Sequence, residues 1–152
     1  MQIYTDGGCS GNPGPGGWAY VMVIKTFQGE TVAAEDWGAE HNTTNNRMEL
    51  MAVISALKAL KEKKGLPRQI TLYTDSQYVQ KGITEWIQNW KARDWKTADK
   101  KPVKNKDLWQ ELDSISFAGD YSINWQWIKG HAGNVYNERC DSLTQKAIAS
   151  IR

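Results

Sequence analysis

The chain has 152 residues, of which 40% are apolar, and a formal net charge of +2. This length and composition suit one domain with a real core, so we expect a single domain over residues 1–152. No stretch approaches the roughly 18 apolar residues of a membrane helix. The first residues, MQIYTDGG, lack the basic and apolar regions of a signal peptide. Two cysteines form neither a disulfide framework nor a zinc pattern, so we expect a cytoplasmic protein with no membrane partner.

The positive charge is unevenly distributed along the chain. Residues 91–106, KARDWKTADKKPVKNK, hold seven Lys or Arg against two Asp, which is a local charge of +5. We call residues 91–106 the basic segment. Such asymmetry indicates that a polyanion contacts one region of the protein rather than its whole surface.

The first half of the chain predicts three strands and a helix. A strand at residues 2–6 precedes a loop at 7–17, which is dominated by Gly and Pro. Strands follow at 18–27 and 31–40. Leu, Ile and Val at helical spacing then predict a long helix over residues 43–65, stopped by Gly65 and the following Pro.

The second half alternates strands with helices. We expect a strand at 68–74, a helix at 76–90 interrupted near Gly82, a helix at 106–117, a strand at 121–129, a loop at 130–134 and a helix at 135–151. The order β-β-β-α-β-α-α-β-α combines an antiparallel meander with helical crossovers between parallel strands. The predicted fold is therefore α/β, a mixed sheet flanked by helices.

Two strands end in the same acid, since QIYTD closes with Asp6 and TLYTD with Asp75. If these strands are parallel neighbours, both acids leave one face at the carboxyl end of the sheet, where ligands bind in such folds. Glu49 lies in the first turn of the long helix, in line with an apolar stripe, and is expected to face the sheet. Asp141 lies in the last helix, one residue off its apolar stripe.

Four ionised carboxylates in one pocket repel one another. At ~4 Å and an effective dielectric constant near 20, each pair costs about 4 kcal/mol. Such a cluster persists by taking up protons or by binding cations. Oxygen ligands suit Mg²⁺ or Mn²⁺, and two such ions can clamp both oxygens of a phosphodiester in an in-line displacement.

Each acid also has an ordinary structural interpretation. Asp6 before Gly could be a turn residue, and Asp75 before Ser could be a helix N-cap. Asn46 and Glu49 fit a capping box, and Asp141 could be an exposed helical acid. Spacing alone leaves these interpretations and the metal site equally open.

Longer strings carry a family resemblance. The stretches YTDGGCSGNPGPGGWAYV, TTNNRMELMAVISAL, LYTDSQYV, WKTADKKPVKNKDLWQ and WIKGHAGNVYNERCD occur in this order and together cover nearly the whole chain. They resemble type 1 ribonuclease H, the bacterial ribonuclease HI family. The resemblance implies a ribonuclease H-like fold with a five-stranded mixed sheet, and Mg²⁺-dependent cleavage (Mn²⁺ substituting) of the RNA strand in an RNA–DNA hybrid. The products would carry 5′-phosphate and 3′-hydroxyl ends, and we expect a monomer.

The resemblance also implies roles for the acids. Asp6 and Asp75 would hold two metal ions, with Asp6 bridging them, and Glu49 would ligate one ion near the ribose. Asp141 would complete the other ion's ligands. The family's loop histidine matches His131 in KGHAG, suited to proton transfer or product departure.

The substrate contacts implied by the resemblance fall into three groups. The first group lies along the minor groove and consists of Cys9, Asn12, Asn45, Asn46 and Gln77. The second is Thr44, which would contact a DNA phosphate. The third belongs to the basic segment, which resembles the family's basic protrusion, and would contact phosphates through Lys91, Arg93, Lys96, Lys100 and Lys101. Helix capping is the alternative for Thr44 to Asn46, and a solvated loop is the alternative for the lysines. Trp86 and Trp90, four residues apart, predict packing of the basic segment onto its helix, with base stacking by Trp86 as the other use.

The basic segment departs from the family pattern. Bacterial relatives carry KKRGWK where this chain has KARDWK, so Ala92 and Asp94 replace a lysine and a glycine. We expect weaker hybrid binding than in a fully basic relative. The main alternative function is a non-catalytic hybrid-binding module of the same fold.

Overall fold

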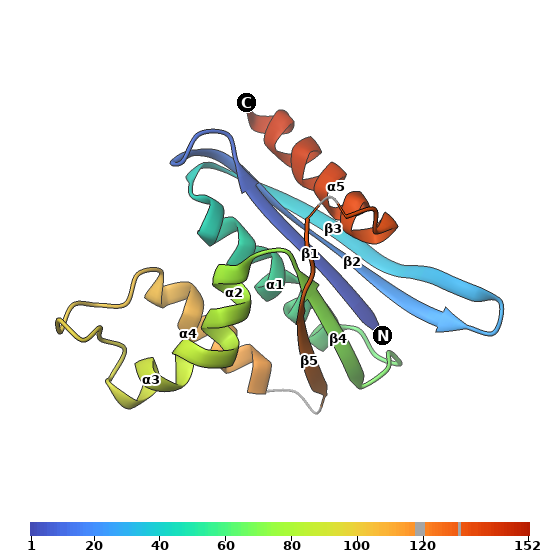
Figure 1. Cartoon of the computed structure of the whole chain (residues 1–152). Helices are drawn as coiled ribbons and strands as arrows, with labels where there is room; N and C mark the ends of the chain where they lie inside the picture. Colours follow the sequence, from blue (N-terminus) through green and yellow to red (C-terminus); the bar gives the residue numbers. More distant parts are fainter. Residues whose placement is uncertain (118–120, 131) are drawn as a thin grey trace.

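The computed structural model describes residues 1–117, 121–130 and 132–152. Across these residues five strands form one mixed sheet in the order β3-β2-β1-β4-β5 (Figure 1). The first three strands are antiparallel, whereas β4 runs parallel to both β1 and β5. The strands are β1 (Gln2–Cys9), β2 (Gly14–Thr26), β3 (Gly29–Thr43), β4 (Gln69–Thr74) and β5 (Ser122–Trp127).

The helices begin and end close to the predicted residues. They are α1 (Asn45–Glu62), α2 (Gln77–Lys81), the π-helical turn η1 (Gly82–Trp86), α3 (Ile87–Ala92), α4 (Lys106–Phe117) and α5 (Val135–Ile151). The predicted α/β class and mixed sheet are confirmed. Within the described ranges, none of the helices has the length and apolar character needed to cross a membrane.

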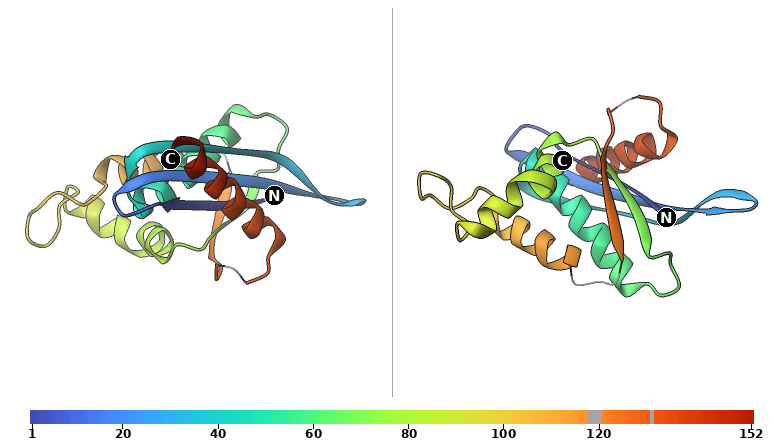
Figure 2. Two further views of the ribbon diagram at one scale, coloured as in Figure 1. Left: turned by 90° about the horizontal axis from the view of Figure 1, so that it is seen from above. Right: turned by 60° about the horizontal axis from the view of Figure 1, so that its bottom comes forward.

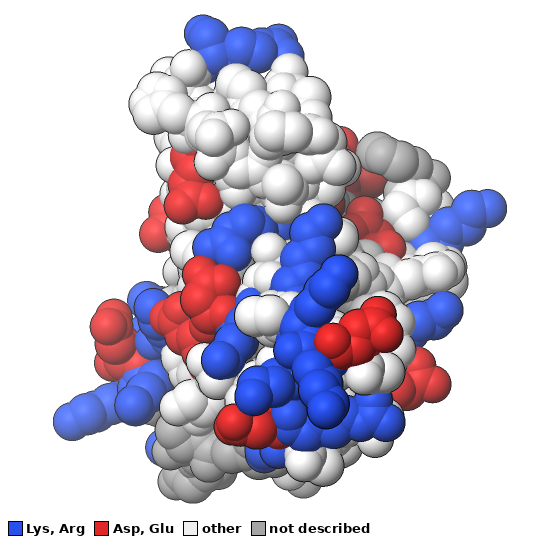
Figure 3. Space-filling view, turned by 90° about the vertical axis from the view of Figure 1, so that its left-hand side faces the viewer, with Lys and Arg blue, Asp and Glu red and all other residues white. Residues whose placement is uncertain are grey.

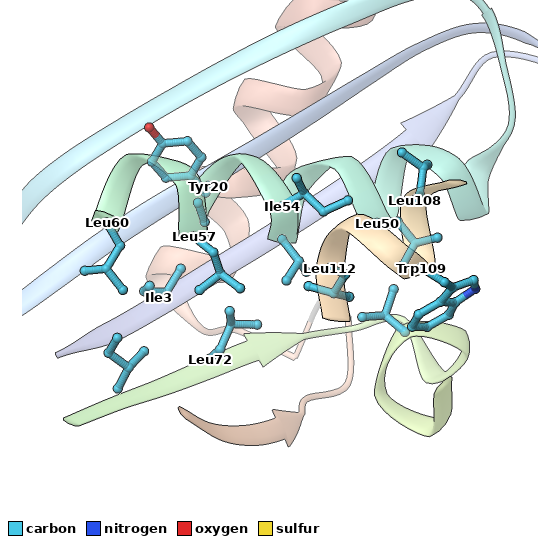
Figure 4. Close-up of a cluster of buried hydrophobic side chains, with 14 of the residues drawn as sticks. Ile3, Tyr20, Leu50, Ile54, Leu57, Leu60, Leu72, Leu108, Trp109 and Leu112 are labelled. Carbon is cyan, nitrogen blue, oxygen red and sulfur yellow. The ribbon is translucent and has the colours of Figure 1, made fainter. Parts of the chain in front are cut away.

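Helices cover both faces of the sheet and create two cores. α1 and α4 lie on one face, where Ile3, Leu72 and Leu57 belong to the larger buried cluster (Figure 4). α5 lies across β1, β2 and β3 on the other face, where Cys140 and Leu143 pack with Tyr4. The two views in Figure 2 show α5 on the opposite side of the sheet from α1. The sheet is thus packed against helices on both of its faces.

The predicted loop at 7–17 is wrong over most of its length. β1 continues to Cys9 and β2 begins at Gly14, so the two strands already pair at Gly8 and Gly17. Gly7 and Gly17 serve close packing rather than a turn. A Cβ on Gly7 would lie 2.3 Å from the carbonyl carbon of Met48, and one on Gly17 would lie 2.8 Å from the side chain of Ala147. A glycine inside a strand often marks such a close approach of another backbone or side chain.

The predicted interruption at Gly82 is a π-helical turn. A Cβ on Gly82 would lie 2.0 Å from the ring of Trp109, a fully buried residue of α4, so the ring packs directly against the helix backbone at Gly82. Trp90 lies 5.9 Å from Trp86, 6.4 Å from Trp95 and 5.2 Å from Trp109, measured between ring centroids. Trp95 of the basic segment thus packs against Trp90 of its preceding helix, as the spacing of the tryptophans predicts, and Trp109 joins the cluster from α4.

Candidate metal centre

The carboxyl ends of β1 and β4 bring two acids together. Tyr4 pairs with Tyr73 and Thr5 with Thr74 in the parallel ladder, so Asp6 and Asp75 follow at the same edge of the sheet. The rings of Tyr4 and Tyr73 stack at 4.8 Å directly behind them on the same face. The alternation of side chains predicted this juxtaposition.

Glu49 reaches the same edge from α1. The N–H of Gly7 donates to Glu49 Oε1 at 2.7 Å, which ties the helix to β1 just beyond Asp6. The capping-box alternative is wrong, because the N-cap is Thr44, whose hydroxyl accepts from the N–H of Arg47. The N-cap of α2 is likewise Ser76 and not Asp75. Asp6 lies inside β1 rather than in a turn.

The three carboxylates are mutually close and poorly solvated. Asp6, Glu49 and Asp75 each offer an oxygen, and these oxygens all lie within 4.8 Å of one another. Asp6 is 6% exposed and Glu49 is 8% exposed. Burial, together with the Asp75 carboxylate, raises the pKa of Asp6 to about 7. Burial and the charges of Asp6 and Asp75 also raise the pKa of Glu49 well above its usual value.

This arrangement fits a divalent cation. Glu49 Oε2 is buried and has no hydrogen-bond partner among the described residues. A buried oxygen without a partner costs on the order of 1–3 kcal/mol, and a cation within reach of all three acids would remove that cost as well as the mutual repulsion. An all-oxygen donor set suits Mg²⁺ or Mn²⁺ rather than zinc.

The other two predicted catalytic residues are placed less directly. Asp141 is half-buried on α5 and lies outside the group of three, but its charge contributes to the raised pKa of Asp6. It is therefore within electrostatic reach of the cluster. His131 lies outside the described residues.

The thiols of both cysteines near the centre donate hydrogen bonds to backbone carbonyls. Burial raises the pKa of the Cys140 thiol well above its usual value, and this thiol donates to the Tyr4 carbonyl at 3.2 Å. Cys9 is half-buried, and its thiol donates to the carbonyls of Gly14 and Thr43, each at 3.3 Å. Neither thiol is positioned as a nucleophile.

Several predicted minor-groove residues converge beside the centre. The N–H of Asn45, the first residue of α1, donates to Asn12 Oδ1 at 3.1 Å, which joins the β1–β2 turn to the helix. Thr44 and Asn46 flank this contact, and Gln77 is the exposed first residue of α2, two residues after Asp75. Backbone N–H groups at the start of α1 can also bind phosphate, so capping and binding by Thr44 are compatible.

The basic segment divides its predicted phosphate contacts. Arg93, Lys96 and Lys100 line one hollow of about 300 Å³, and a neighbouring hollow of about 200 Å³ is lined by Trp86 as well as by Arg93 and Lys96. Lys91 instead pairs with Asp113 of α4 at 3.4 Å. Lys101 is exposed and lines neither hollow. Figure 3 shows Lys and Arg gathered on this end of the molecule, with a few acids between them.

The sequence interpretation missed one connection between the two regions. Arg47 in the first turn of α1 pairs with Asp107 at 2.8 Å and donates to Asn105 Oδ1 at 3.3 Å. The side-chain amide of Asn105 in turn donates to the hydroxyl of Tyr78 at 3.1 Å. These contacts join the end of the basic segment to the helix that carries Glu49. An arginine two residues before a predicted ligand was the available signal.

The fold and the site define an α/β protein whose carboxylate cluster is suited to divalent cations. The sequence model of the RNase H family matches residues 1–149. A ribonuclease H of Treponema denticola is 57% identical, covering 97% of this chain and 96% of the relative. A second ribonuclease H, from Cupriavidus metallidurans, is 57% identical over 99% of this chain and 97% of its own length. The chain therefore belongs to the ribonuclease H family and is an enzyme of that class.

Solved structures agree with this assignment. LC9-RNase H1, a type 1 RNase H with the type 2 active-site motif, superposes with a TM-score of 0.86 at 32% identity, over 99% of this chain and 72% of its own. LC11-RNase H1, solved in complex with an RNA/DNA hybrid, has a TM-score of 0.72 at 26% identity, over 98% and 96% of the two chains. The resemblance to type 1 ribonuclease H is thus confirmed.

Proposed function

We propose that this chain hydrolyses the RNA strand of RNA–DNA hybrids with two Mg²⁺ ions, leaving 5′-phosphate and 3′-hydroxyl ends. The observation that carries the proposal is the convergence of carboxylate oxygens of Asp6, Glu49 and Asp75 within 4.8 Å, with Asp6 and Glu49 buried. When bound, the ions would lower the pKa of the attacking water and stabilise the leaving 3′ oxygen.

The residues around the ions have distinct tasks in this proposal. Asp6, Glu49 and Asp75 would hold the ions, and the hydrogen bond from the Gly7 N–H fixes the rotamer of Glu49. Asp141 would add a further carboxylate from α5. His131 transfers a proton or assists product departure.

Binding of the hybrid uses the surface beside the centre. In the proposal, Asn12, Asn45, Asn46, Gln77 and Cys9 lie along the minor groove, where the 2′-hydroxyls that distinguish RNA are displayed. Thr44 holds a phosphate of the DNA strand, and the basic segment holds further phosphates without reading sequence. The complex of LC11-RNase H1 with an RNA/DNA hybrid supports this class of substrate. We further propose that the protein acts as a cytoplasmic monomer.

One assay tests the activity and its alternative. A labelled RNA–DNA hybrid is incubated with the protein and MgCl₂, beside duplex DNA, duplex RNA and a phosphomonoester. We expect cleavage of the RNA in the hybrid alone, with fragments that a polynucleotide kinase labels only after phosphatase treatment. Binding of the hybrid without cleavage would favour a non-catalytic module. Undiminished turnover in excess chelator would contradict the metal mechanism.

A further inference from the structure

The end of β5 and the residues that follow it lie beside the end of β4 and contact the main chain of Asp75. Thr74, the last residue of β4, pairs with Trp127, and the N–H of Ile128 donates to the Thr74 carbonyl at 2.9 Å. The next carbonyl along the chain, that of Asp75, accepts at 2.9 Å from the indole N–H of Trp127. A side chain thus continues the ladder at the point where the strand pairing stops.

The same segment also borders the Asp75 carboxylate. A Cβ on Gly130 would lie 3.0 Å from Asp75 Oδ2 and 3.7 Å from both Cβ and Cγ of Asp75. Such a 3.0 Å contact is tighter than nearly all real Cβ contacts, so the carboxylate would have to move by a few tenths of an ångström. Gly130 has no left-handed φ, which means that its backbone would accept a side chain. The glycine is required by the carboxylate and not by its own conformation.

We propose that Trp127 and Gly130 are positioning residues for Asp75. Trp127 holds the main chain of Asp75, and the bare backbone at Gly130 leaves the Asp75 carboxylate the room to keep an oxygen within 4.8 Å of the oxygens of Asp6 and Glu49. The inference rests on the proposed role of Asp75 as a metal ligand. Groups that orient a ligand from behind typically change metal affinity by about 10–100-fold when they are altered.

The test compares two glycines of one loop. Gly130→Ala places a methyl group against Asp75, whereas Gly133→Ala strains a left-handed residue, at φ +87°, whose Cβ would meet no atom of the described residues within 4 Å. Calorimetric titration of each full-length variant with MgCl₂ alone, without substrate, measures metal affinity directly. We expect Gly130→Ala to weaken Mg²⁺ binding about tenfold and Gly133→Ala to leave it unchanged.

Turnover adds a second readout. The kcat of Gly130→Ala should fall at low MgCl₂ and return at high MgCl₂, with KM for the hybrid unchanged, which general structural damage would not produce. Trp127→Phe keeps an aromatic ring but removes the donor, so it should also weaken Mg²⁺ binding. Because Trp127→Phe leaves the loop glycines intact, it decides the question if Gly130→Ala does not fold.

The outcomes separate the inference from the proposed function. A wild-type protein that neither binds Mg²⁺ nor cleaves the hybrid would overturn the proposed function. A wild-type protein that does both, while Gly130→Ala and Trp127→Phe titrate as it does, would overturn the positioning roles alone. Equal losses in Gly130→Ala and Gly133→Ala would also overturn them, since the effect would then come from the loop and not from contact with Asp75.

Discussion

The carboxylate cluster and the basic segment carry opposite charges and are constructed in opposite ways. The cluster has two buried members, Asp6 and Glu49, and is assembled from β1, α1 and the end of β4, which are distant in sequence but regular in structure. The basic segment is one contiguous, exposed stretch with left-handed φ at four residues: Asp94, Trp95, Lys100 and Asn105. Each left-handed residue costs on the order of 1 kcal/mol.

This difference shows what each kind of charge requires. Like charges held within a few ångströms need rigid elements, and either bound protons or a cation, to be stable. Exposed cations repel weakly in water, so they need only a scaffold, here provided by Trp90 and Trp95. We therefore expect changes in the cluster to abolish chemistry, and changes in the basic segment to alter binding by degrees.

The largest effect is expected for Asp75→Asn. The amide keeps the shape of the side chain but loses the charge that a divalent cation needs, so kcat should fall by more than about a hundredfold. Hybrid binding, measured by anisotropy of a labelled duplex, should change little. If binding disappeared together with cleavage, Asp75 would be a structural residue.

Asp6→Asn should stabilise the metal-free protein at high pH. The folded protein raises the pKa of Asp6 from 3.8 to about 7, so the native state holds a proton that the unfolded state has lost. Stability from this group is full below pH 3.8 and is lost as the pH rises through about 7. At pH 8 the variant should gain on the order of 2 kcal/mol in free energy of unfolding.

Urea denaturation with a chelator at pH 5 to 8 measures this gain. The wild type should lose stability as the pH rises across that range, and MgCl₂ should restore that stability at pH 8. The stability of Asp6→Asn should depend less on pH and on MgCl₂. Glu49, whose pKa is also raised, keeps part of the pH dependence in the variant. Identical profiles of stability against pH for the wild type and Asp6→Asn would show that the pKa of Asp6 is not raised in the metal-free protein.

In the basic segment, Ala92→Lys combined with Asp94→Gly should tighten hybrid binding several-fold. The pair raises the net charge by two, since one lysine is gained and one aspartate is lost, and glycine suits the left-handed φ of 54° at position 94. The slope of log affinity against log salt should steepen by about 0.7–0.9 for each added phosphate contact. Glu62→Lys at the end of α1 changes the charge equally and should leave the slope unchanged.

The smallest effect is expected where the two regions are joined. Asp107 is exposed, and the Arg47 guanidinium lowers the pKa of its carboxyl. Asp107→Asn should therefore reduce the free energy of unfolding at neutral pH by less than about 1 kcal/mol. The loss should shrink in high salt and at pH values where the wild-type carboxyl is protonated. A larger loss would mean that the pair does more than link α1 to α4.

Regular elements were the part of the fold that the sequence predicted best. Helices at 106–117 and 135–151 end at the predicted residues because apolar periodicity and the flanking loops agree there. The loop at 7–17 was wrong because glycine has two uses, and only the tertiary contact of Gly7 with Met48 distinguishes them. No local pattern contains that contact.

The site shows the same division. Period-two alternation predicted the meeting of Asp6 with Asp75, and the apolar stripe of α1 predicted that Glu49 faces inward. The partners that hold these acids were not predictable, because the Gly7 N–H and the Trp127 indole come from distant positions. Gly130 gave no separate signal, since a glycine beside a loop histidine is ordinary.

Gly7 limits the substitutions that this centre can accept. Because a Cβ there would lie 2.3 Å from Met48 and 2.4 Å from the backbone nitrogen of Glu49, the spacing between two of the acids is written into the main chain. Rotamer adjustments cannot restore that spacing once a larger residue has forced the strand and helix apart. A side chain at position 7 should therefore separate Asp6 from Glu49, whereas a Cβ on the neighbouring Gly8 would lie 3.7 Å from Thr144, an ordinary van der Waals contact.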